Sequence, residues 1–394
     1  MKLSQRITDI NGGGSDGWGV FYRARRMVAE GVPVTELSIG EHDIGTSEDI
    51  LRAMHASATG GHTGYAMVPG IDALRRTVAD RIATRTGVPT TLDNILITPG
   101  GQSALFAAHT AVCDPGDTAL YIDPYYATYP STLRGVGAVP KAIVTSPDTA
   151  FQPTRAALAQ AAKGATSLLV NSPNNPTGAV YSMATLTAIA ETCIANDLWL
   201  ISDEVYDTQV WDGEHISPRS LPGMADRTLV VGSMSKSHAM TGSRVGWICG
   251  PSDVISRLID LATNTTYGVA GFIQDAALFA LGQGTAVEET VAAPFRRRRA
   301  LALAVLEGQN IVRPVPAQGA MYVMLDIRGT GLSGEAFAEA LLDAELIAVM
   351  PGESFGQAAA GHIRVAMTVA DEAFTDALKR LVRFAQNHAK VDAK

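Results

Sequence analysis

Six short apolar segments, most of them separated by helix-like stretches, place the strongest constraint on how this chain can fold. Because these segments are apolar throughout rather than alternating, they are typical of strands buried on both faces of a parallel sheet. Helix-like stretches are clearest at 102–113, 154–162 and 183–195. Such strand–helix–strand alternation predicts a doubly wound α/β fold. The predicted strands are 94–98, 118–122, 167–170, 198–202, 228–231 and 245–249.

The pattern changes after about residue 285, which predicts a second, smaller α+β domain. We expect a large domain with a mostly parallel sheet at 46–285. The small domain is expected to combine 286–394 with the N-terminal segment 1–45. Its predicted elements are helices at 286–307, 334–344 and 371–387 and strands at 321–326 and 363–367.

Charge and composition exclude several classes of function. The net charge of -8 over 394 residues leaves no basic footprint for nucleic acid, and the basic run 296–299 is isolated. No apolar run has the length of a signal peptide core or a membrane span. The three cysteines fit no metal motif, so we expect buried thiols, no metal site and a cytoplasmic protein.

Four loops that follow predicted strands carry unusual chemistry. Ligands of open α/β sheets bind at the carboxyl ends of the strands, so the placement is informative. The loop SPNNPTG at 172–178 is fixed by two prolines and a glycine and presents the Asn175 amide. The loop SDEVYD at 202–207 offers Asp203 to a protonated ring nitrogen and Tyr206 to a ring oxygen.

The other two loops provide an amine and a binding site for an anion. In SMSKSHAMTGSR, the hydroxyl of Ser233 and the guanidinium of Arg244 suit a phosphate, and Lys236 suits imine formation with a carbonyl. In TPGGQS, a glycine pair opens a helix whose first amides can hold an anion. The remaining phosphate contacts are therefore assigned to Gly100, Gly101 and Gln102.

Taken together, the four loops describe one ligand with a phosphate, a ring nitrogen, a ring oxygen and an aldehyde. Pyridoxal 5′-phosphate has these four groups, and its chemistry depends on a lysine and an acidic partner. The stretch at 12–17 also satisfies G-x-G-x-x-G by letter. It has no good strand before it, so we interpret it as an entry loop rather than a nicotinamide site.

The sequence resembles the class I/II, fold-type I pyridoxal-phosphate aminotransferases from about residue 37 to 384. The most specific matches are NSPNNPTG, SDEVYD and SMSKSHAMTGSRVGW, with PGESFG and HIRVAM near the end. The resemblance implies a ping-pong transfer of an amino group between an L-amino acid and a 2-oxo acid. It also implies catalytic roles for Lys236 as the Schiff-base lysine, Asp203 as the pyridinium partner and Tyr206.

Further roles follow from the same resemblance. Asn175 and Tyr206 are implied donors to the phenolic oxygen of the cofactor, and Ser233 and Arg244 are implied phosphate ligands. Tyr126 takes the position of the aromatic residue that stacks on the ring.

The resemblance also implies the residues that bind the substrate and the partner subunit. Arg364 matches the arginine that binds the substrate carboxylate, next to the backbone of Gly40 and to Asn175. Tyr65 resembles the tyrosine that reaches the phosphate of a neighbouring subunit, which implies a homodimer with shared active sites.

Some residues depart from the pattern of the family. His42 replaces a common proline, His238 a common aromatic residue and Ser243 a larger residue. Substrate contacts are expected from 16–18, His42 and Tyr267. No second arginine can be placed for a side-chain carboxylate, so a neutral or aromatic donor is expected. A carbon–sulfur β-lyase and a non-catalytic regulator that binds the same cofactor remain alternatives.

Overall fold

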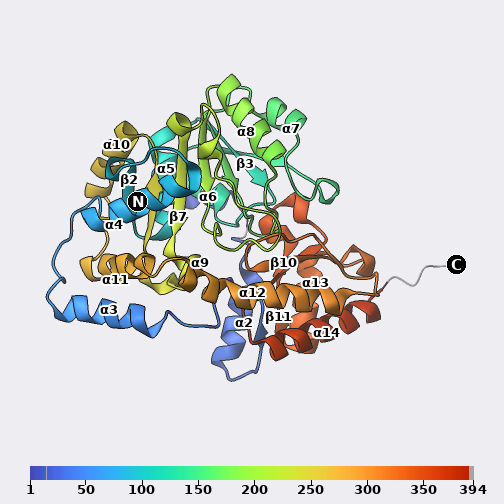
Figure 1. Ribbon diagram of the computed structural model, residues 1–394. Coiled ribbons are helices and arrows are strands. Elements are labelled where there is room, and N and C mark those ends of the chain that lie inside the picture. The colour runs from blue at the N-terminus through green and yellow to red at the C-terminus, as the bar shows by residue number, and fades with distance from the viewer. Residues whose placement is uncertain (15, 390–394) are drawn as a thin grey trace.

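A seven-stranded sheet in the order β2-β8-β7-β6-β5-β3-β4 organises the larger part of the chain (Figure 1). The computed structural model describes residues 1–14 and 16–389. Strand β8 is antiparallel to both of its neighbours, and the other strands run parallel. The predicted doubly wound, mostly parallel sheet is therefore confirmed. The strands are β2 (Ile95–Thr98), β3 (Thr118–Asp123), β4 (Val139–Val144), β5 (Ser167–Asn171), β6 (Trp199–Asp203), β7 (Thr228–Ser233) and β8 (Gly246–Cys249).

Strand β4 is the one strand of this sheet that the sequence did not predict. It lies at the edge and pairs only with β3. Val139 and Val144 are exposed, and Pro140 falls within the strand. Edge strands tolerate proline and solvent-facing side chains because one row of their backbone groups has no partner strand. The uniform apolar pattern that marks the inner strands is consequently missing.

Helices cover both faces of the sheet because successive residues of each strand point to opposite sides. Leu96 packs in one apolar cluster with α5, α6 and α10, whereas Ile95 and Ile97 pack on the other face with α4 and α11. On that second face, α7 and α8 cover the strands nearer β4. The bounds of the helices are α3 (Glu48–Thr59), α4 (Asp72–Thr86), α5 (Gly100–Val112), α6 (Tyr129–Val136), α7 (Arg155–Ala161), α8 (Met183–Ala195), α10 (Ser252–Thr263) and α11 (Gly271–Gly282).

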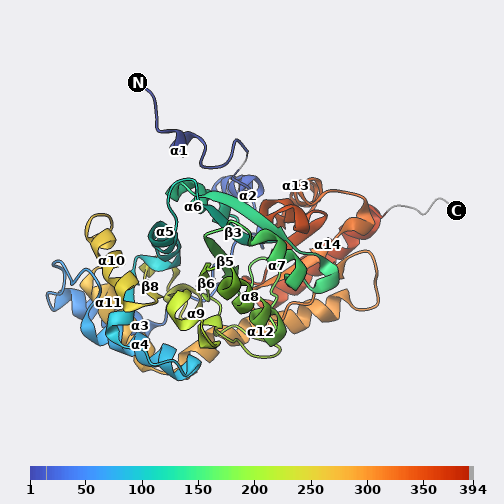
Figure 2. The ribbon, with the colours of Figure 1, turned by 90° about the horizontal axis from the view of Figure 1, so that it is seen from above.

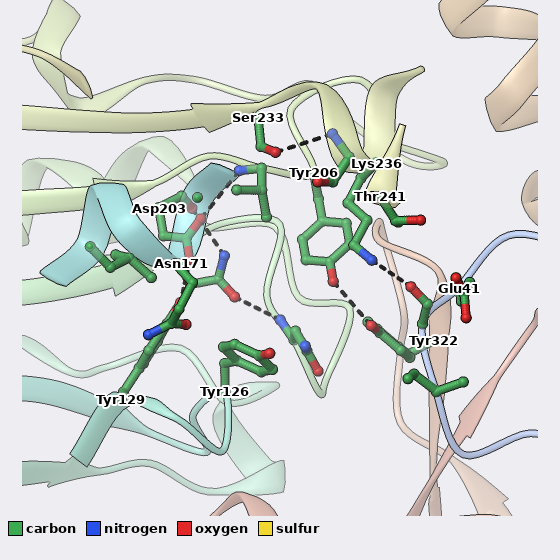
Figure 3. A pocket seen from close by; sticks show the side chains of 18 of the residues that line it. Glu41, Tyr126, Tyr129, Asn171, Asp203, Tyr206, Ser233, Lys236, Thr241 and Tyr322 are labelled. Carbon is green, nitrogen blue, oxygen red and sulfur yellow. Dashed lines mark hydrogen bonds between the residues drawn. The ribbon is translucent and has the colours of Figure 1, made fainter. Parts of the chain in front are cut away.

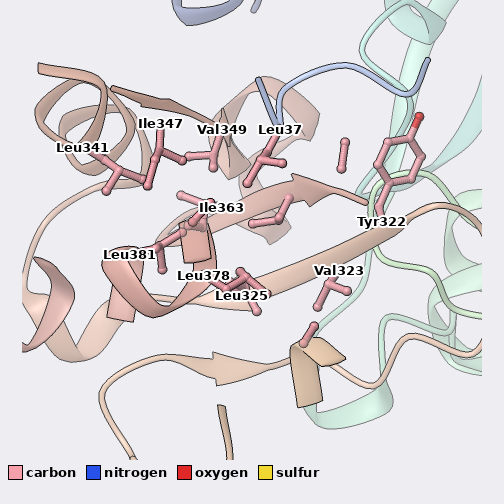
Figure 4. Close-up of a cluster of buried hydrophobic side chains, with 14 of the residues drawn as sticks. Leu37, Tyr322, Val323, Leu325, Leu341, Ile347, Val349, Ile363, Leu378 and Leu381 are labelled. Atoms are coloured by element: carbon pink, nitrogen blue, oxygen red, sulfur yellow. The ribbon is translucent and has the colours of Figure 1, made fainter. Parts of the chain in front are cut away.

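A second, four-stranded antiparallel sheet has the order β12-β13-β10-β9 and lies beside α12, α13 and α14 (Figure 1). Leu325 and Ile363 from this sheet pack with Leu341 and Leu378 from the helices, and all four are fully buried (Figure 4). The helices and strands of this part of the chain, including the separate pair β1 and β11, are α2 (Gly19–Ala29), β1 (Thr35–Glu36), α12 (Thr285–Leu306), β9 (Arg313–Pro314), β10 (Tyr322–Asp326), α13 (Gly334–Glu345), β11 (Ile347–Ala348), β12 (Met350–Pro351), β13 (His362–Ala366) and α14 (Asp371–Asn387).

The N-terminal segment with α1 (Gln5–Thr8) lies against α6, as seen from above in Figure 2. The glycine-rich stretch 12–17 therefore follows a short helix and not a strand, which removes the structural context of a dinucleotide fingerprint. Residue 15 of that stretch lies outside the described residues. Among the described residues, no helix is long and apolar enough to cross a membrane.

Candidate active site

Three neighbouring parallel strands in the middle of the large sheet bring their last residues together at their carboxyl ends. Asn171 ends β5, Asp203 ends β6 and Ser233 ends β7, and Asn171 is paired in register with Asp203. All three line a cavity of about 290 Å³. Loops that are far apart in the sequence therefore share one site because the sheet aligns their starting points (Figure 3).

The carboxylate of Asp203 is buried at the floor of this cavity and is only 4% exposed. Its Oδ2 accepts a hydrogen bond from the Tyr129 hydroxyl at 2.7 Å, and its Oδ1 accepts one from the Val205 amide at 3.3 Å. Burial raises the pKa of Asp203 to about 6, although both hydrogen bonds act to lower it. Near neutral pH the group is an anion in a dry position, which suits a cationic ring nitrogen.

The amine of Lys236 comes from a short helix, α9 (Met234–Ser237), which starts directly after β7. The Ser233 side chain caps this helix by accepting a hydrogen bond from the Ser235 amide at 3.1 Å. The Lys236 amine donates to the Gly40 carbonyl across the cavity. Burial lowers the pKa of Lys236, so the neutral, nucleophilic amine is easier to form than in water.

An anion-binding corner lies where α5 begins. Gly100 has φ +79° and stands so close to Arg244 that a Cβ atom would overlap the guanidinium. The α5 amino terminus and the hydroxyls of Ser233 and Thr241 face the same space. Gln102 lines the cavity, but its amide donates to Thr132 at 2.8 Å and so is already tied to α6.

Arg364 forms the opposite wall and is fully buried, at 1% exposure. Its Nη1 donates to Asn175 Oδ1 at 2.9 Å and its Nη2 to the Ser38 carbonyl at 2.5 Å. The guanidinium carbon lies 4.3 Å from the ring centre of Tyr322 and 4.4 Å from that of Phe355. Within the described residues, Nε has no partner and no carboxylate is within ion-pair distance. A buried cation in that state is suited to an incoming carboxylate.

Two tyrosines complete the wall between Asp203 and Arg364. The Tyr206 and Tyr322 hydroxyls are 3.0 Å apart, and burial raises the pKa of Tyr206 far above its usual value. Tyr126 lines the cavity, and its ring centre lies 5.8 Å from that of Tyr129. Because burial raises the pKa of both Tyr206 and Tyr126, these two hydroxyls are neutral donors near neutral pH.

Most of the residues selected from the sequence line this one cavity. They are Gly40, Gly101, Gln102, Tyr126, Asn175, Asp203, Tyr206, Ser233, Lys236, Arg244 and Arg364, with Gly100 directly behind Arg244. Tyr65 does not line it. Its side chain is 91% exposed and packs against the ring of Tyr267 at 5.1 Å.

The expected substrate contacts are only partly found. Trp18 lines the cavity, but Tyr267 is 52% exposed and lies beside Tyr65. His42 does not line the cavity, and its ring is directed to the backbone carbonyl of Lys236. Asp16 does not line the cavity either and accepts a hydrogen bond from the Tyr22 hydroxyl at 3.3 Å.

Sequence reasoning missed several polar contributors to the cavity. Tyr129, Thr241 and Tyr322 are buried or partly buried polar groups on its wall, and Glu41 lines it as a second acid besides Asp203. The PYYATYP stretch around Tyr129 was a usable signal, because it follows β3 at the same sheet edge. Tyr322 belongs to the other sheet and had no local signal.

The donors present fit pyridoxal phosphate. A buried anion, an amine with a lowered pKa, neutral hydroxyl donors and a cationic corner without room for a Cβ atom occupy separate parts of one cavity. Arg364 remains available for a carboxylate. Among the described residues, no group of three or more metal-binding side chains comes together.

Comparison with known proteins places the chain among enzymes that share this architecture. A family model described as aminotransferase class I and II matches residues 32–381. Arginine–pyruvate transaminase of Pseudomonas aeruginosa is 41% identical over 382 residues, which is 97% of each chain. Aspartate/prephenate aminotransferase of Thermus thermophilus is 36% identical, over 92% of this chain and 93% of that one.

Solved structures agree with this placement. Aspartate aminotransferase of Thermus thermophilus with maleate superposes with a TM-score of 0.91 at 34% identity and covers 98% of this chain and 100% of that chain. An aromatic aminotransferase from Pyrococcus horikoshii gives 0.86 at 31% identity, covering 92% of this chain and 99% of that chain.

Proposed function

The chain belongs to the class I and II aminotransferases and uses pyridoxal phosphate to move an amino group between an amino acid and a 2-oxo acid; from that premise we propose how its own residues divide the work. The observation that carries the assignment is the meeting in one cavity of Asp203, Lys236 and the Arg364 guanidinium, which has no counter-ion among the described residues. When bound, the cofactor supplies an aldehyde for the amino group and a ring that takes up electrons from the substrate carbon.

Asp203 and Tyr206 would hold the ring of the cofactor. The Asp203 anion, stabilised by Tyr129, pairs with a protonated ring nitrogen and keeps that proton in place. The Tyr206 hydroxyl and the Asn175 amide would donate to the ring oxygen, and Tyr126 would pack on the ring. Because Asn175 Oδ1 already accepts from Arg364, its amide nitrogen is the group left to donate.

Gly100, Gly101, Gln102, Ser233 and Arg244 would hold the phosphate. The helix amino terminus contributes backbone amides, and the guanidinium contributes charge.

Lys236 and Arg364 would act on the substrate. Arg364 binds the α-carboxylate with two parallel hydrogen bonds, next to the Gly40 backbone, and so orients the bond that loses a proton. Lys236, whose pKa is lowered by burial, would take the proton from Cα as a neutral amine and deliver it to the former aldehyde carbon of the cofactor, two atoms away. The arrangement gives one base for both transfers and explains why both half-reactions can use the same cavity.

The charges of the cavity also favour a class of amino donor. Its lining cations are Lys236, Arg244 and Arg364, and each already has a role, so a second substrate carboxylate has no partner among the described residues. Glu41 also lines this space, and its exposed carboxylate lies 3.8 Å from the Arg25 guanidinium. A donor with a cationic side chain fits this balance better than the neutral or aromatic donor expected earlier. The similar arginine–pyruvate transaminase supports arginine as donor and pyruvate as acceptor.

The half-reaction with single amino acids tests these roles. Wild-type enzyme loaded with cofactor is expected to convert L-arginine to its 2-oxo acid much faster than L-aspartate, without any acceptor present. Lys236→Ala is expected to lose the conversion, and Lys163→Ala, which changes a lysine outside the cavity, should retain it. Full turnover in Lys236→Ala would contradict the role of this lysine, and a preference for aspartate would contradict the proposed donor.

We also propose that the chain divides into two domains and assembles as a homodimer. A large domain at 46–285 and a small domain from 1–45 and 286–394 agree with the sheets, since α12 leads from the seven-stranded to the four-stranded sheet and β1 pairs with β11. We further propose a homodimer, because Tyr65, Met67 and Tyr267 expose large apolar side chains and the rings of Tyr65 and Tyr267 pack together. Sedimentation as a monomer at micromolar concentration would contradict this.

A cytoplasmic location is supported by three buried, unbridged cysteines.

A further inference from the structure

The backbone carbonyl of Lys236 is held by two side chains. Helix α9 has only four residues, so its last carbonyls have no partners within the helix. The carbonyl oxygen of Lys236 accepts one hydrogen bond from His42 Nε2 at 3.1 Å and another from Gln209 Nε2 at 3.1 Å. Both lone pairs of this oxygen are therefore in use, and the donors come from separate segments of the chain.

His42 is built to donate at this position. A carbonyl oxygen only accepts, so the ring proton must lie on Nε2. Nδ1 is buried and has no hydrogen-bond partner among the described residues, and the ring packs edge-on against Phe295 with centres 5.3 Å apart. Burial lowers the pKa of His42 to about 4, so the ring is neutral under ordinary conditions. A proline at position 42 would make none of these contacts.

Gln209 reaches the same oxygen from the loop after β6. The residue is fully buried, three positions after Tyr206. Its own amide donates to the Tyr206 carbonyl at 2.8 Å, and its carbonyl accepts from Ala320 at 2.8 Å. Its position is therefore fixed by the backbone on both sides. Only the amide nitrogen of its side chain can donate to a carbonyl, which settles the orientation of that group.

The segment 38–46, which carries His42, links the two walls of the cavity. Its Ser38 carbonyl accepts from Arg364 at 2.5 Å, and its Gly40 carbonyl accepts from the Lys236 amine. Farther along, the Thr46 hydroxyl donates to the Ala239 carbonyl at 2.7 Å. The same segment therefore touches the carboxylate-binding arginine and both ends of the reactive lysine.

We propose that His42 and Gln209 are positioning residues that jointly fix the backbone of Lys236 and so hold its amine where the cofactor aldehyde bonds to it. The inference rests on the role of Lys236 proposed above. Loss of one donor leaves the carbonyl bonded to the other. Loss of both donors leaves the buried carbonyl unpaired, which is unfavourable. The peptide is then expected to reorient toward another donor, and this reorientation would displace the Lys236 side chain.

The two effects are therefore expected to be more than additive. His42→Phe and Gln209→Met each remove a donor at similar volume. Each should weaken binding of pyridoxal phosphate about 2- to 10-fold, the usual range for one neutral hydrogen bond. The double variant should lose about 10-fold or more beyond the product of the two, since it leaves the buried carbonyl without a partner.

Equilibrium dialysis against the apo-protein measures this, with two probes. Pyridoxal phosphate carries the aldehyde, whereas 4′-deoxypyridoxine 5′-phosphate lacks it and cannot bond to a lysine. Binding of the deoxy compound should stay at the wild-type value in every variant, which also shows that the variants are folded. His42→Gln, which keeps a donor, should restore most of the affinity, and Thr46→Val serves as control because it removes a neighbouring hydrogen bond of the same segment.

The outcomes separate the possible errors. The joint role would be wrong if the affinity loss of the double variant for pyridoxal phosphate equalled the product of the losses of the two single variants. It would also be wrong if Thr46→Val lost as much affinity as His42→Phe. If both probes lost affinity equally, the residues would act only on the fold of the pocket, which also overturns the inference. Should the double variant not fold, a loss in His42→Phe that His42→Gln does not restore decides against it. Unchanged affinity in Lys236→Ala would instead overturn the role of the lysine itself.

Discussion

Replacement of Tyr129 by phenylalanine tests the electrostatics of the site most directly. The substitution removes one hydroxyl, whose oxygen lies 2.7 Å from Asp203 Oδ2, and leaves the ring that fills the wall. The hydroxyl donates to the ionised carboxylate and so lowers the pKa of Asp203, while burial raises it to about 6. A hydrogen bond to a charged group contributes about 1.5–3 kcal/mol, which corresponds to roughly one to two pKa units. The variant should therefore titrate at roughly pH 7 to 8.

The sign of this change determines the assay. Asp203 binds a protonated ring nitrogen only as an anion, and the anion is lost as pH falls through its pKa. Affinity of the apo-protein for pyridoxal phosphate should therefore begin to fall at a higher pH in Tyr129→Phe than in wild type, by roughly one to two pH units. The ligand titrates identically in both proteins, so its own ionisation cancels in the comparison.

Tyr126→Phe is the matched control for this experiment. It removes the same atom from a tyrosine whose ring centre is 5.8 Å from that of Tyr129, and the Tyr126 hydroxyl is not among the groups that hydrogen-bond Asp203. Its pH dependence should keep the wild-type midpoint. If Tyr129→Phe also kept that midpoint, the reasoning that the hydroxyl holds Asp203 ionised would be refuted.

Two further substitutions test the anion corner and the buried core. Gly100→Ala should weaken binding of pyridoxal phosphate by displacing Arg244, whereas Gly116→Ala, which has a similar positive φ but open space around it, should change binding little when both are measured by dialysis. His109→Leu should raise the free energy of unfolding in acid. Burial lowers the pKa of His109 to about 3 in the folded protein. Below the ordinary pKa of histidine, the unfolded wild-type chain therefore binds a proton that the folded chain does not bind, which favours unfolding. The gain should be absent above about pH 7 and should grow to about 3–5 kcal/mol toward pH 3, as measured by urea unfolding; equal pH slopes in both proteins would contradict it.

Much of the large sheet and half of the site follow from local sequence. The inner strands are apolar throughout because both faces are covered, and this is visible in any short window. Once β5, β6 and β7 are parallel neighbours, Asn171, Asp203 and Ser233 must meet at one edge, and the loops that follow them bring Asn175 and Lys236 along. The sequence alone therefore determined which cofactor chemistry the chain is equipped for.

Other features depend on contacts between distant segments. Strand β4 escaped prediction because an edge strand needs no continuous apolar pattern. The stretch around Tyr129 indicates that it follows β3, but it does not indicate that its hydroxyl meets a carboxylate 74 positions away. Within the described part of the chain, Arg364 has no counter-ion, and the rings of Tyr322 and Phe355 enclose its guanidinium. Enclosure of that kind depends on how the second sheet packs, and no local pattern encodes it.

His42 shows the division between the two most clearly. From the sequence it is a polar residue next to a predicted substrate-binding glycine, and a side chain directed at the substrate is a reasonable expectation. The chain path between the two sheets instead turns its ring to a carbonyl 194 positions away. A sequence determines which donors and acceptors a segment carries; which of them meet is decided by the packing of whole elements, since a hydrogen bond forms only where that packing brings the two atoms within about 3 Å.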